Sequence, residues 1–572
     1  MAASTDMKSS RPFWPLVFFL ALALIIFGRL AYLTVVKAPE YSAMASEART
    51  VSFPIEPRRG TIYDRNGTVL AVSVEATTIY ANPVEIEDPA ATAVQLASVL
   101  GKNMEDYLPI LTANKTNYSV IVRKADVELA DKVKELDLDG IYFVSESRRE
   151  YPHGQVAGQI IGACSIGVDE ENNREYYYGV SGLEAYYDDI LSGEVGYYEA
   201  ERGRDGSPIP GGVHESVAAV DGQDIIISID LELQEALEKR LVEGIEDLDA
   251  ESGSALVMDG GSGEIYAAAS LPLFNPADRS EVEEGATKLK CVTDLFEPGS
   301  IFKSVSTMAL LETNTMSPDD TIFCPAAITA DGYTISDAHE RGDETFSLRQ
   351  ILDQSSNVGI SLAVESMGFD ELYNHIIEYN LHSVTGVDYP GEGEIGTEYL
   401  GNLPSFDCWS RVTGYNISFG QGLSVTPLQM ARFYGALVND GVECTPHFLV
   451  SKPQSGEIVE YPSEDVIANK AAIPTITSML QTVVTDGTGK RAAIEGFDVA
   501  GKTSTAEIYD EENGGYREGV YNLAFTGFLA NSSSQLVCFV GANEVPDDSS
   551  VTPLFKDIMT TAIDRFRISP DK

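Results

Sequence analysis

The hydropathy pattern begins with one long apolar stretch, residues 12–36, in which Arg29 is the only charge. As a helix, this stretch is long enough to cross a hydrocarbon core of about 30 Å, and it predicts a membrane anchor. Lys8 and Arg11 precede it, so the positive-inside tendency places the N-terminus in the cytoplasm and the rest of the chain outside. A cleaved signal peptide is the alternative, because Ala43-Met44-Ala45 offers a small-x-small site. The stretch exceeds the roughly 7–15 apolar residues of a signal sequence, which favours an uncleaved anchor.

Shorter apolar patterns predict the elements of the second half of the chain. Apolar and alternating runs predict strands at residues 225–229, 254–258, 264–270, 499–508, 523–530 and 535–541. Helical periodicity dominates the middle of this region, and helices are expected at residues 230–241, across most of 300–437, and at 553–566. Strands at both ends of a helical middle indicate an α+β domain whose sheet pairs early with late segments.

Turn-forming residues organise the segment that follows the anchor. Asn66-Gly67 stands between two apolar runs and predicts a β-hairpin, because both residues accept positive φ. A charge network that pins this turn is a purely structural interpretation of Arg59, Asp64 and Arg65. Farther along, Ser181 is expected to cap a short helix.

A Gly- and Pro-rich stretch from Gly203 to Gly222 is the best candidate for a domain boundary. We therefore expect four parts: a cytoplasmic tail, the anchor, a first extracytoplasmic domain and a larger C-terminal domain, at residues 1–11, 12–36, 37–215 and 216–572. The 572 residues and 44% hydrophobic content are ample for such packed cores.

Charge and cysteine usage narrow the function. The chain carries 39 Lys+Arg against 88 Asp+Glu, a net charge of -49, which would repel nucleic acid phosphates. The six cysteines are widely spaced without a CxxC pair, and most are expected to be small buried hydrophobic residues. The six histidines show no ligand spacing such as HExxH. No nucleic acid partner, metal or other cofactor is expected.

Three short motifs carry candidate chemistry: Ser300-Ile301-Phe302-Lys303, Ser355-Ser356-Asn357 and Lys502-Thr503-Ser504. Helical character follows Ser300, which should place it at a helix N-terminus, where free N–H groups stabilise developing negative charge. Lys303, at i+3, shares its helix face and can act as a base if desolvation and a second cation, Lys502, lower its pKa. Alone, each motif could be a capped helix, a polar turn or an edge strand. Together, in this order, they indicate a serine acyl-transfer enzyme.

With these motifs, the sequence resembles a class B penicillin-binding protein, a membrane-anchored peptidoglycan D,D-transpeptidase. The resemblance covers nearly the whole chain and includes Arg59-Gly60, Asp64-Arg65-Asn66-Gly67, Ser181-Gly182-Leu183-Glu184, Ser418-Phe419-Gly420-Gln421-Gly422, Thr426-Pro427-Leu428-Gln429 and Asp486-Gly487-Thr488-Gly489. It implies a transpeptidase domain with the penicillin-binding-protein and serine β-lactamase-like fold, a sheet flanked by helices, behind an elongated non-catalytic pedestal or dimerisation domain and one transmembrane helix. Phe296-Glu297-Pro298-Gly299 resembles division-type members more than elongation-type ones.

The resemblance also implies how the reaction proceeds. Ser300 would attack the carbonyl between the two terminal D-alanines of a stem peptide while Lys303 takes its proton. Ser355 would relay a proton to the leaving amine, and Asn357 would hold Lys303 and the donor amide. An amine of a neighbouring stem peptide would then resolve the acyl-enzyme into a cross-link.

Substrate recognition is implied for the third motif. Lys502, Thr503 and Thr505 would receive the carboxylate of the substrate or of a β-lactam, and the backbone N–H groups of Ser300 and Thr505 would form the oxyanion hole. Ser504 departs from the family pattern, because glycine normally stands there and permits close approach of the ligand. We therefore expect Ser504→Gly to raise the rate of acylation by penicillin.

Two other functions compete with the transpeptidase. A β-lactamase or D,D-carboxypeptidase would hand the acyl group to water, but the anchor, the long segment before the catalytic domain and the lack of an obvious Glu-x-x-Leu-Asn segment argue against a lactamase. A non-catalytic division scaffold is the second alternative, and the intact motif set argues against it. The resemblance further implies a polytopic membrane glycan polymerase that contacts the pedestal and the anchor.

Overall fold

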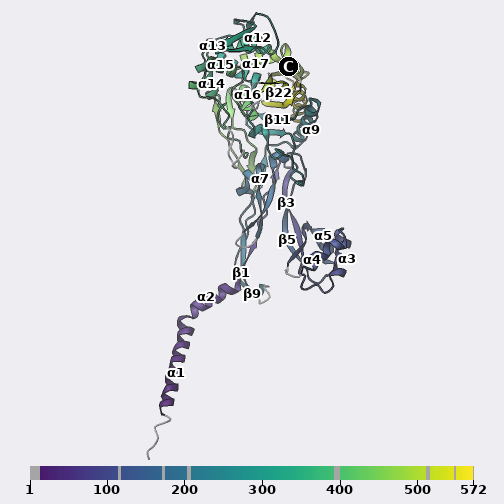
Figure 1. Cartoon of the computed structure of the whole chain (residues 1–572), viewed down its shortest axis with the longest axis vertical. Coiled ribbons are helices and arrows are strands. Elements are labelled where there is room, and N and C mark those ends of the chain that lie inside the picture. The colour runs from purple at the N-terminus through teal and green to yellow at the C-terminus, as the bar shows by residue number, and fades with distance from the viewer. Residues whose placement is uncertain are drawn as a thin grey trace, which may run out of the picture. The chain divides into compact units, whose positions relative to one another are not determined.

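The computed structural model describes residues 13–113, 118–169, 174–202, 208–391, 400–509, 516–546 and 549–570 (Figure 1). The expected cytoplasmic tail, with Lys8 and Arg11, lies outside these residues. The chain forms two compact units, one made of Met1–Pro57 with Gly193–Asp221 and the other of Arg58–Ser192 with Gly222–Lys572.

The first unit contains the apolar N-terminal helix. Helix α1 (Phe13–Ala31) continues through a π-helical turn, Tyr32–Val36, so that Phe13–Val36 forms one helix long and apolar enough to cross a membrane. This agrees with the predicted span, and most of its large apolar side chains are exposed, as a lipid-facing helix requires. Helix α2 (Ala38–Arg49) follows. Strands β1 (Thr50–Ile55), β8 (Gly196–Arg202) and β9 (Pro208–Val217) form an antiparallel sheet in the order β1-β8-β9.

The second unit begins with a long mixed sheet in the order β19-β18-β10-β2-β3-β4, with β5 paired to β3. The bounds of its strands are Ile62–Tyr63 (β2), Val69–Ala81 (β3), Ser119–Asp126 (β4), Ile141–Glu150 (β5), Ile225–Ile227 (β10), Leu449–Lys452 (β18) and Glu457–Ile458 (β19). Helices α3 (Pro89–Leu100), α4 (Met104–Leu111) and α5 (Val127–Lys134) bury their apolar faces against β3, β4 and β5 in a small separate core. This sheet joins the N-terminal half of the unit to the part that carries the motifs.

The predicted hairpin is present, because β2 and β3 pair antiparallel around the turn. Gly67 alone has positive φ there, at 86°, and Asn66 instead donates its backbone N–H to the carboxylate of Asp64. The expected cap at Ser181 is wrong in detail. Ser181 precedes α7 (Gly182–Tyr186), but its hydroxyl accepts from the N–H of Ala163 rather than from the helix, because α6 (Gly158–Ile161) and α7 pack closely there.

A buried charge cluster ties these segments together around Glu184, which is 0% exposed. Arg59 donates from Nε to one carboxylate oxygen of Glu184 at 2.6 Å, and Arg149 donates to the other at 2.7 Å. Arg59 also contacts Asp188 at 2.6 Å. Burial opposes the negative charge, but the two guanidinium groups prevail and lower the pKa of Glu184. The charge network expected to pin the turn is therefore wrong in its partners: Arg59 pairs with Glu184 and Asp188, Arg65 pairs with Glu264 at 3.4 Å, and Asp64 accepts backbone N–H groups of the turn.

The motif-bearing part is built on a five-stranded sheet in the order β12-β11-β23-β22-β21. The strands are β11 (Ser252–Asp259), β12 (Ile265–Ser270), β21 (Asp498–Tyr509), β22 (Tyr516–Ala530) and β23 (Leu536–Val545), all antiparallel to their neighbours. Early and late segments therefore pair, as the α+β prediction required.

Helices cover both faces of this sheet, as Figure 1 shows for α9 on one side and α12–α17 on the other. On the first face, α9 (Leu231–Asp247) and α18 (Thr552–Phe566) pack against alternate strand residues such as Val257 and Val540. On the second face, α11 (Lys303–Glu312) and α16 (Pro427–Val438) pack against residues such as Phe528 and Phe539. Successive side chains along each strand point to opposite faces, so the sheet lies between two separate hydrophobic cores.

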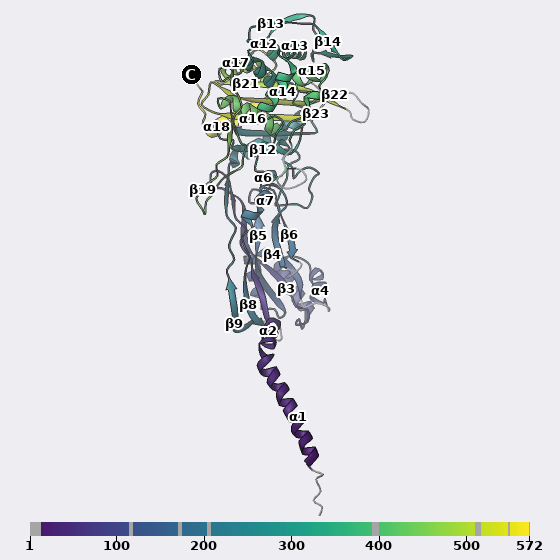
Figure 2. The ribbon, with the colours of Figure 1, turned by 90° about the vertical axis from the view of Figure 1, so that its left-hand side faces the viewer.

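The helical middle is less uniform than expected. Helices α12, α13, α14, α15 and α17 span Leu348–Asp353, Asn357–Met367, Phe369–Glu378, Arg411–Ser418 and Ala472–Thr485. Four short strands interrupt the described part of this region. Strand β13 (Thr321–Cys324) pairs with β16 (Glu344–Ser347), and between them in sequence β14 (Ala327–Ala330) and β15 (Tyr333–Ser336) form a hairpin. Figure 2 shows β13 and β14 beyond α12 and α13, away from the sheet.

Candidate active site

Ser300 lies where the prediction placed it, at the start of a helix. It belongs to a 3-10 turn, Gly299–Phe302, that leads directly into α11. The turn is fixed from outside, because Gly299 donates its N–H to the carbonyl of Gly420 at 2.9 Å. Gly420 has a φ of 87°, and a Cβ on it would lie 2.1 Å from the carbonyl oxygen of Gly299. The Gly420 position of the 418–422 segment therefore holds the nucleophile's turn in place.

Lys303 is the centre of the site. It is fully buried, and its Nζ lies 2.9 Å from Ser300 Oγ, 3.1 Å from Ser355 Oγ, 2.7 Å from Asn357 Oδ1 and 2.6 Å from the carbonyl oxygen of Ser355. The i+3 spacing from Ser300 thus brings amine and hydroxyl into hydrogen-bond contact, as predicted. The amine joins the first two motifs in one network.

The second motif reaches this network through an unusual backbone conformation. Ser355 has a φ of 56°, a left-handed value that a residue with a side chain adopts only at a cost. In this conformation both its carbonyl oxygen and its hydroxyl are directed at Lys303, and its Oγ donates to Ser300 Oγ at 3.0 Å. The following residue, Ser356, accepts the N–H of Gly359 and begins α13. The strained backbone of Ser355 therefore directs its hydroxyl and its carbonyl oxygen toward Lys303.

Lys502 completes the cluster from the edge strand β21. It is fully buried, and its Nζ donates to Ser355 Oγ at 3.1 Å and to Thr503 Oγ1 at 3.3 Å. Thr503 Oγ1 also lies 2.7 Å from Thr488 Oγ1, which belongs to the 486–489 motif. Thr505 is exposed on the same strand. The three motifs, distant in sequence, therefore meet at one place, as predicted.

Two buried amines so close together have lowered pKa values. For Lys303, burial is the main cause and the charge of Lys502 the second, while Asp337 acts in the opposite direction, and the resulting pKa lies well below the usual lysine value. For Lys502, burial lowers the pKa to about 7, against the effect of Asp353. The neutral form of Lys303 is thus more accessible than that of an exposed lysine, which a base requires.

Ser504 makes a contact that the sequence did not predict. The backbone N–H of Ser300 donates to Ser504 Oγ at 3.0 Å. Gly299 makes room for this side chain, since a Cβ on Gly299 would lie 2.4 Å from the same oxygen. Ser504 is 5% exposed and lines a neighbouring cavity of about 360 Å³. The side chain in the glycine position is therefore turned inward, onto the nucleophile's own amide.

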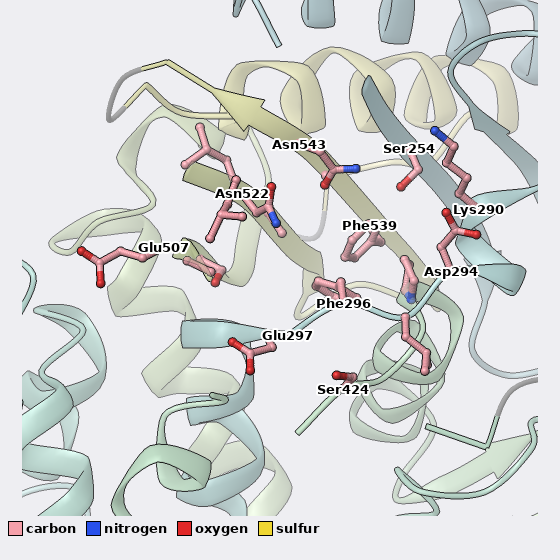
Figure 3. Close-up of a pocket in the computed structure, with 18 residues that line it drawn as sticks. Ser254, Lys290, Asp294, Phe296, Glu297, Ser424, Glu507, Asn522, Phe539 and Asn543 are labelled. Carbon is pink, nitrogen blue, oxygen red and sulfur yellow. The ribbon is translucent and has the colours of Figure 1, made fainter. Parts of the chain in front are cut away.

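The neighbouring cavity lies between the inner face of the sheet and the segment that leads to Ser300. Its lining includes Phe296, which meets Phe539 edge to face at 5.7 Å between ring centroids. Figure 3 shows Phe296 beside Phe539, with Asn522 and Asn543 on the strands. Glu297 also lines the cavity and accepts the N–H of Gly422 at 3.0 Å. The cavity therefore extends the site behind strand β21.

Asp337 is the site residue that sequence reasoning missed. Its carboxylate accepts from Ser356 Oγ at 2.8 Å and from the N–H of Val358 at 2.9 Å, and it forms an ion pair with Arg341 at 2.5 Å. These contacts hold the loop that carries Ser355 and Asn357. Asp337 precedes the second motif on a separate hairpin, and no pattern in its surroundings marks it.

The cysteines and the possible metal-ligating side chains show no sign of a second reactive site within the described residues. All six cysteines are free thiols, and five of them are buried, which agrees with the expectation that most serve as small hydrophobic residues. Within the described part of the chain, no group of His, Cys, Asp and Glu side chains is placed to hold a metal ion.

Comparisons with known proteins are consistent with this geometry. The family model described as "Penicillin binding protein transpeptidase domain" matches residues 253–560, and the model described as "Penicillin-binding Protein dimerisation domain" matches residues 54–227. The first match includes every residue of the three motifs, and the second covers the Glu184 cluster and the hairpin at Gly67.

Individual relatives align over nearly the full length. The chain is 29% identical to "Stage V sporulation protein D" of Bacillus subtilis over 100% of this chain and 88% of that protein. It is 30% identical to "Peptidoglycan D,D-transpeptidase FtsI" of Escherichia coli over 96% of this chain and 91% of that one. A crystal structure of penicillin binding protein 3 from Mycobacterium tuberculosis complexed with ampicillin matches with a TM-score of 0.67 and 25% identity, covering 91% of this chain and 98% of the other.

Proposed function

Because this chain belongs to the class B penicillin-binding proteins, and to their division type, we propose that it is a peptidoglycan D,D-transpeptidase that cross-links stem peptides through an acyl-enzyme on Ser300. Its donor substrate is a peptide ending in D-alanyl-D-alanine, and β-lactams acylate the same serine. The transpeptidase domain and its relatives support this reaction class.

One observation carries the assignment of roles: the amine of Lys303 contacts Ser300 Oγ, Ser355 Oγ and Asn357 Oδ1 at once, at 2.9, 3.1 and 2.7 Å. A buried amine with a lowered pKa and a direct contact to a hydroxyl is a suitable general base for that hydroxyl. A helix cap whose lysine points to solvent would show none of these contacts.

Acylation follows from this geometry. Ser300 Oγ forms a bond to the penultimate D-alanine carbonyl carbon, and its proton moves to Lys303 Nζ. The resulting oxyanion is stabilised by the N–H groups of Ser300 and Thr505. When the C–N bond breaks, Ser355 Oγ delivers a proton to the leaving nitrogen, and D-alanine departs. Ser355 contacts both Lys303 and Lys502, so its hydroxyl can be reprotonated from either amine.

Recognition and the second half-reaction use the remaining motif residues. Protonated Lys502, with the hydroxyls of Thr503 and Thr505 on the edge strand, receives the terminal carboxylate of the donor. Asn357 keeps Lys303 in place and offers its amide to the donor peptide. An amine of a neighbouring stem peptide then attacks the ester carbonyl and gives up a proton to Lys303. As the ester C–O bond breaks and the new amide bond remains, Lys303 returns a proton to Ser300 Oγ.

Labelled penicillin tests the proposal. We expect one stable adduct per chain, located on Ser300 by mass spectrometry and absent in Ser300→Ala. Rapid loss of the label with release of hydrolysed antibiotic would instead support a β-lactamase or D,D-carboxypeptidase. Absence of labelling in a folded wild-type protein would support a non-catalytic division scaffold.

The N-terminal apolar helix supports a topology and a partner for this protein. The helix Phe13–Val36 is a single-pass anchor, and the charges at Lys8 and Arg11 favour a cytoplasmic N-terminus with an extracytoplasmic catalytic domain. We propose that the anchor and the pedestal, which we place at residues 37–215 ahead of a catalytic domain at 216–572, contact a polytopic glycan polymerase. Protease protection in oriented vesicles tests the topology, and detergent co-purification before and after replacing the anchor tests the partner.

A further inference from the structure

The oxyanion site contains an internal competitor. The backbone N–H of Ser300, one of the two donors that would stabilise the oxyanion, is already bound by Ser504 Oγ at 3.0 Å. An incoming carbonyl oxygen needs the same N–H. Substrate and Ser504 therefore cannot both use this donor fully.

The donor itself has little freedom to turn away. Gly299, immediately before Ser300, has a φ of 52°, and its N–H is bound to the carbonyl of Gly420 at 2.9 Å. The close approach at Gly420 leaves no room between the two backbones. Beyond Ser300, the chain enters α11 directly. The direction of the Ser300 N–H is therefore fixed by the fold.

The acceptor, in contrast, has somewhere to go. Ser504 has a single side-chain torsion with three staggered positions, and it stands in the wall of the cavity of about 360 Å³ behind the strand. The lining of the cavity also includes polar residues, among them Glu297 and Asn522. Rotation about one bond would move the hydroxyl from the Ser300 amide into this space without any change in the backbone.

We propose that Ser504 is a displaceable latch on the oxyanion site. In the resting enzyme its hydroxyl occupies the Ser300 N–H, and an acyl donor must displace it into the cavity before the tetrahedral intermediate can be stabilised. This inference rests on the proposed transpeptidase function. In this role Ser504 sets the acylation rate through its hydroxyl group, whereas crowding of the site would act through the volume of its side chain.

Three substitutions of Ser504 separate the effect of its hydroxyl group from the effect of its side-chain volume. Ser504→Ala removes only the hydroxyl, Ser504→Gly removes the whole side chain, and Ser504→Thr keeps a hydroxyl. The second-order rate of penicillin acylation should rise roughly tenfold in both Ser504→Ala and Ser504→Gly, the factor expected for losing one competing neutral hydrogen bond. Ser504→Thr should remain slow. Exposed Ser455, in a distant turn, provides the control Ser455→Ala with an unchanged rate.

A boronic acid provides a second readout that does not depend on turnover. It forms a tetrahedral adduct on Ser300 with one oxygen in the oxyanion site, so its affinity measures access to the Ser300 N–H. The latch predicts that Ser504→Ala binds the boronic acid more tightly than the wild type, by the same factor as the increase in the rate of penicillin acylation. If only Ser504→Gly raised the acylation rate and the boronate affinity, the volume of the side chain would be responsible and the latch would be wrong. If Ser504→Ala were acylated more slowly than the wild type, the hydroxyl would assist acylation, which would also overturn the latch.

Failure of the latch and failure of the proposed function give different results. If wild-type protein takes up penicillin on Ser300 but Ser504→Ala matches it in both rate and boronate affinity, the latch is wrong and the function stands. If the folded wild-type protein takes up neither reagent, the proposed function itself is wrong.

Discussion

Two buried charge clusters in the same unit of this protein handle charge in opposite ways. Around Glu184, one carboxylate receives two guanidinium groups, and each ion has a partner of opposite sign in direct contact. Around Lys303, two buried amines share Ser355 as a hydrogen-bond partner, and among the described residues their hydrogen bonds go to neutral oxygen atoms. The first arrangement favours the charged forms and the second disfavours them, and the pKa of Glu184 and of Lys303 both fall as a result.

The difference separates a stabilising cluster from a reactive one. A fully paired buried network resists change, because removing one partner leaves the others uncompensated. A buried amine without a carboxylate partner gives up its proton readily, and that is the property of a base. Each prediction below tests whether the two clusters divide these roles.

The largest effect is expected for Lys303→Met. Loss of the base should slow penicillin acylation by about 10²–10⁴-fold. The free energy of unfolding should not fall, because the substitution removes a buried amine that pays a desolvation penalty and replaces it with an apolar chain of similar length. Stopped-flow acylation and urea unfolding measure the two quantities. Lys239→Met, on the exposed face of α9, is the control, and equal loss of rate in both variants would contradict the role of Lys303.

Glu184→Gln should show the reverse pattern. Neutralising the shared carboxylate leaves Arg59 and Arg149 buried without their counter-charge, so the free energy of unfolding should fall by about 3–5 kcal/mol. Protein that remains folded should still be acylated by penicillin at the wild-type rate. Urea unfolding followed by intrinsic fluorescence measures the loss.

The control for Glu184 is Glu75→Gln. Glu75 pairs with Arg58 at 2.9 Å, but both side chains are more than half exposed, so the expected loss is below about 1 kcal/mol. Equal losses in the two variants would show that burial of the Glu184 cluster contributes little to stability.

The pH dependence of acylation should report the coupling between the two lysines. Lys303 acts as a base only when neutral, so the rate should rise with pH through its lowered pKa, and it should fall again as Lys502 loses its proton with a pKa of about 7. Lys502→Met removes the second cause of the Lys303 shift. Its ascending limb should therefore move to higher pH and its descending limb should disappear. An unmoved ascending limb would show that Lys502 does not affect the base.

The smallest effect is expected for Asp337→Asn, which loosens the loop that carries Ser355. Acylation should slow by roughly tenfold or less, because positioning is impaired while every reacting group remains. Asp337 raises the pKa of Lys303, so the ascending limb should move to lower pH, opposite to the Lys502→Met shift. Asp343→Asn lies in the same connection between β15 and β16, where the Asp343 carboxylate accepts the N–H of Ala326 at 2.9 Å, and it should leave the profile unchanged.

Sequence patterns predicted the frame of the site well, for identifiable reasons. Strands β11 and β23 are apolar runs bounded by turn residues, and burial on both faces makes such runs conspicuous. The contact between Ser300 and Lys303 follows from helical spacing alone. Strands β13 and β14 could not be found in this way, because both are short and mostly exposed and carry no apolar alternation.

The missing details of the site all depend on tertiary structure. The positive φ of Ser355 has no marker in a Ser-Ser-Asn sequence. Asp337 contributes through a hairpin whose position next to α13 is set by packing. The side chain of Ser504 was expected to hinder close approach of the ligand, but its direction depends on the strand's face and on the room left at Gly299. Local patterns therefore located the reacting groups but not the contacts that orient them.

The order of strands has a consequence for biosynthesis. Strand β11, the first of the sheet in sequence, pairs with β23, the last, at Ser252↔Asn543 through Asp259↔Leu536. A nascent chain therefore cannot close the sheet until β23 has been made, and long-range pairing of this kind is slow. Ser300 is made well before Lys502 and can meet it only after β21 has been made. A truncated chain would thus be both inactive and prone to aggregate through its unpaired β11 edge.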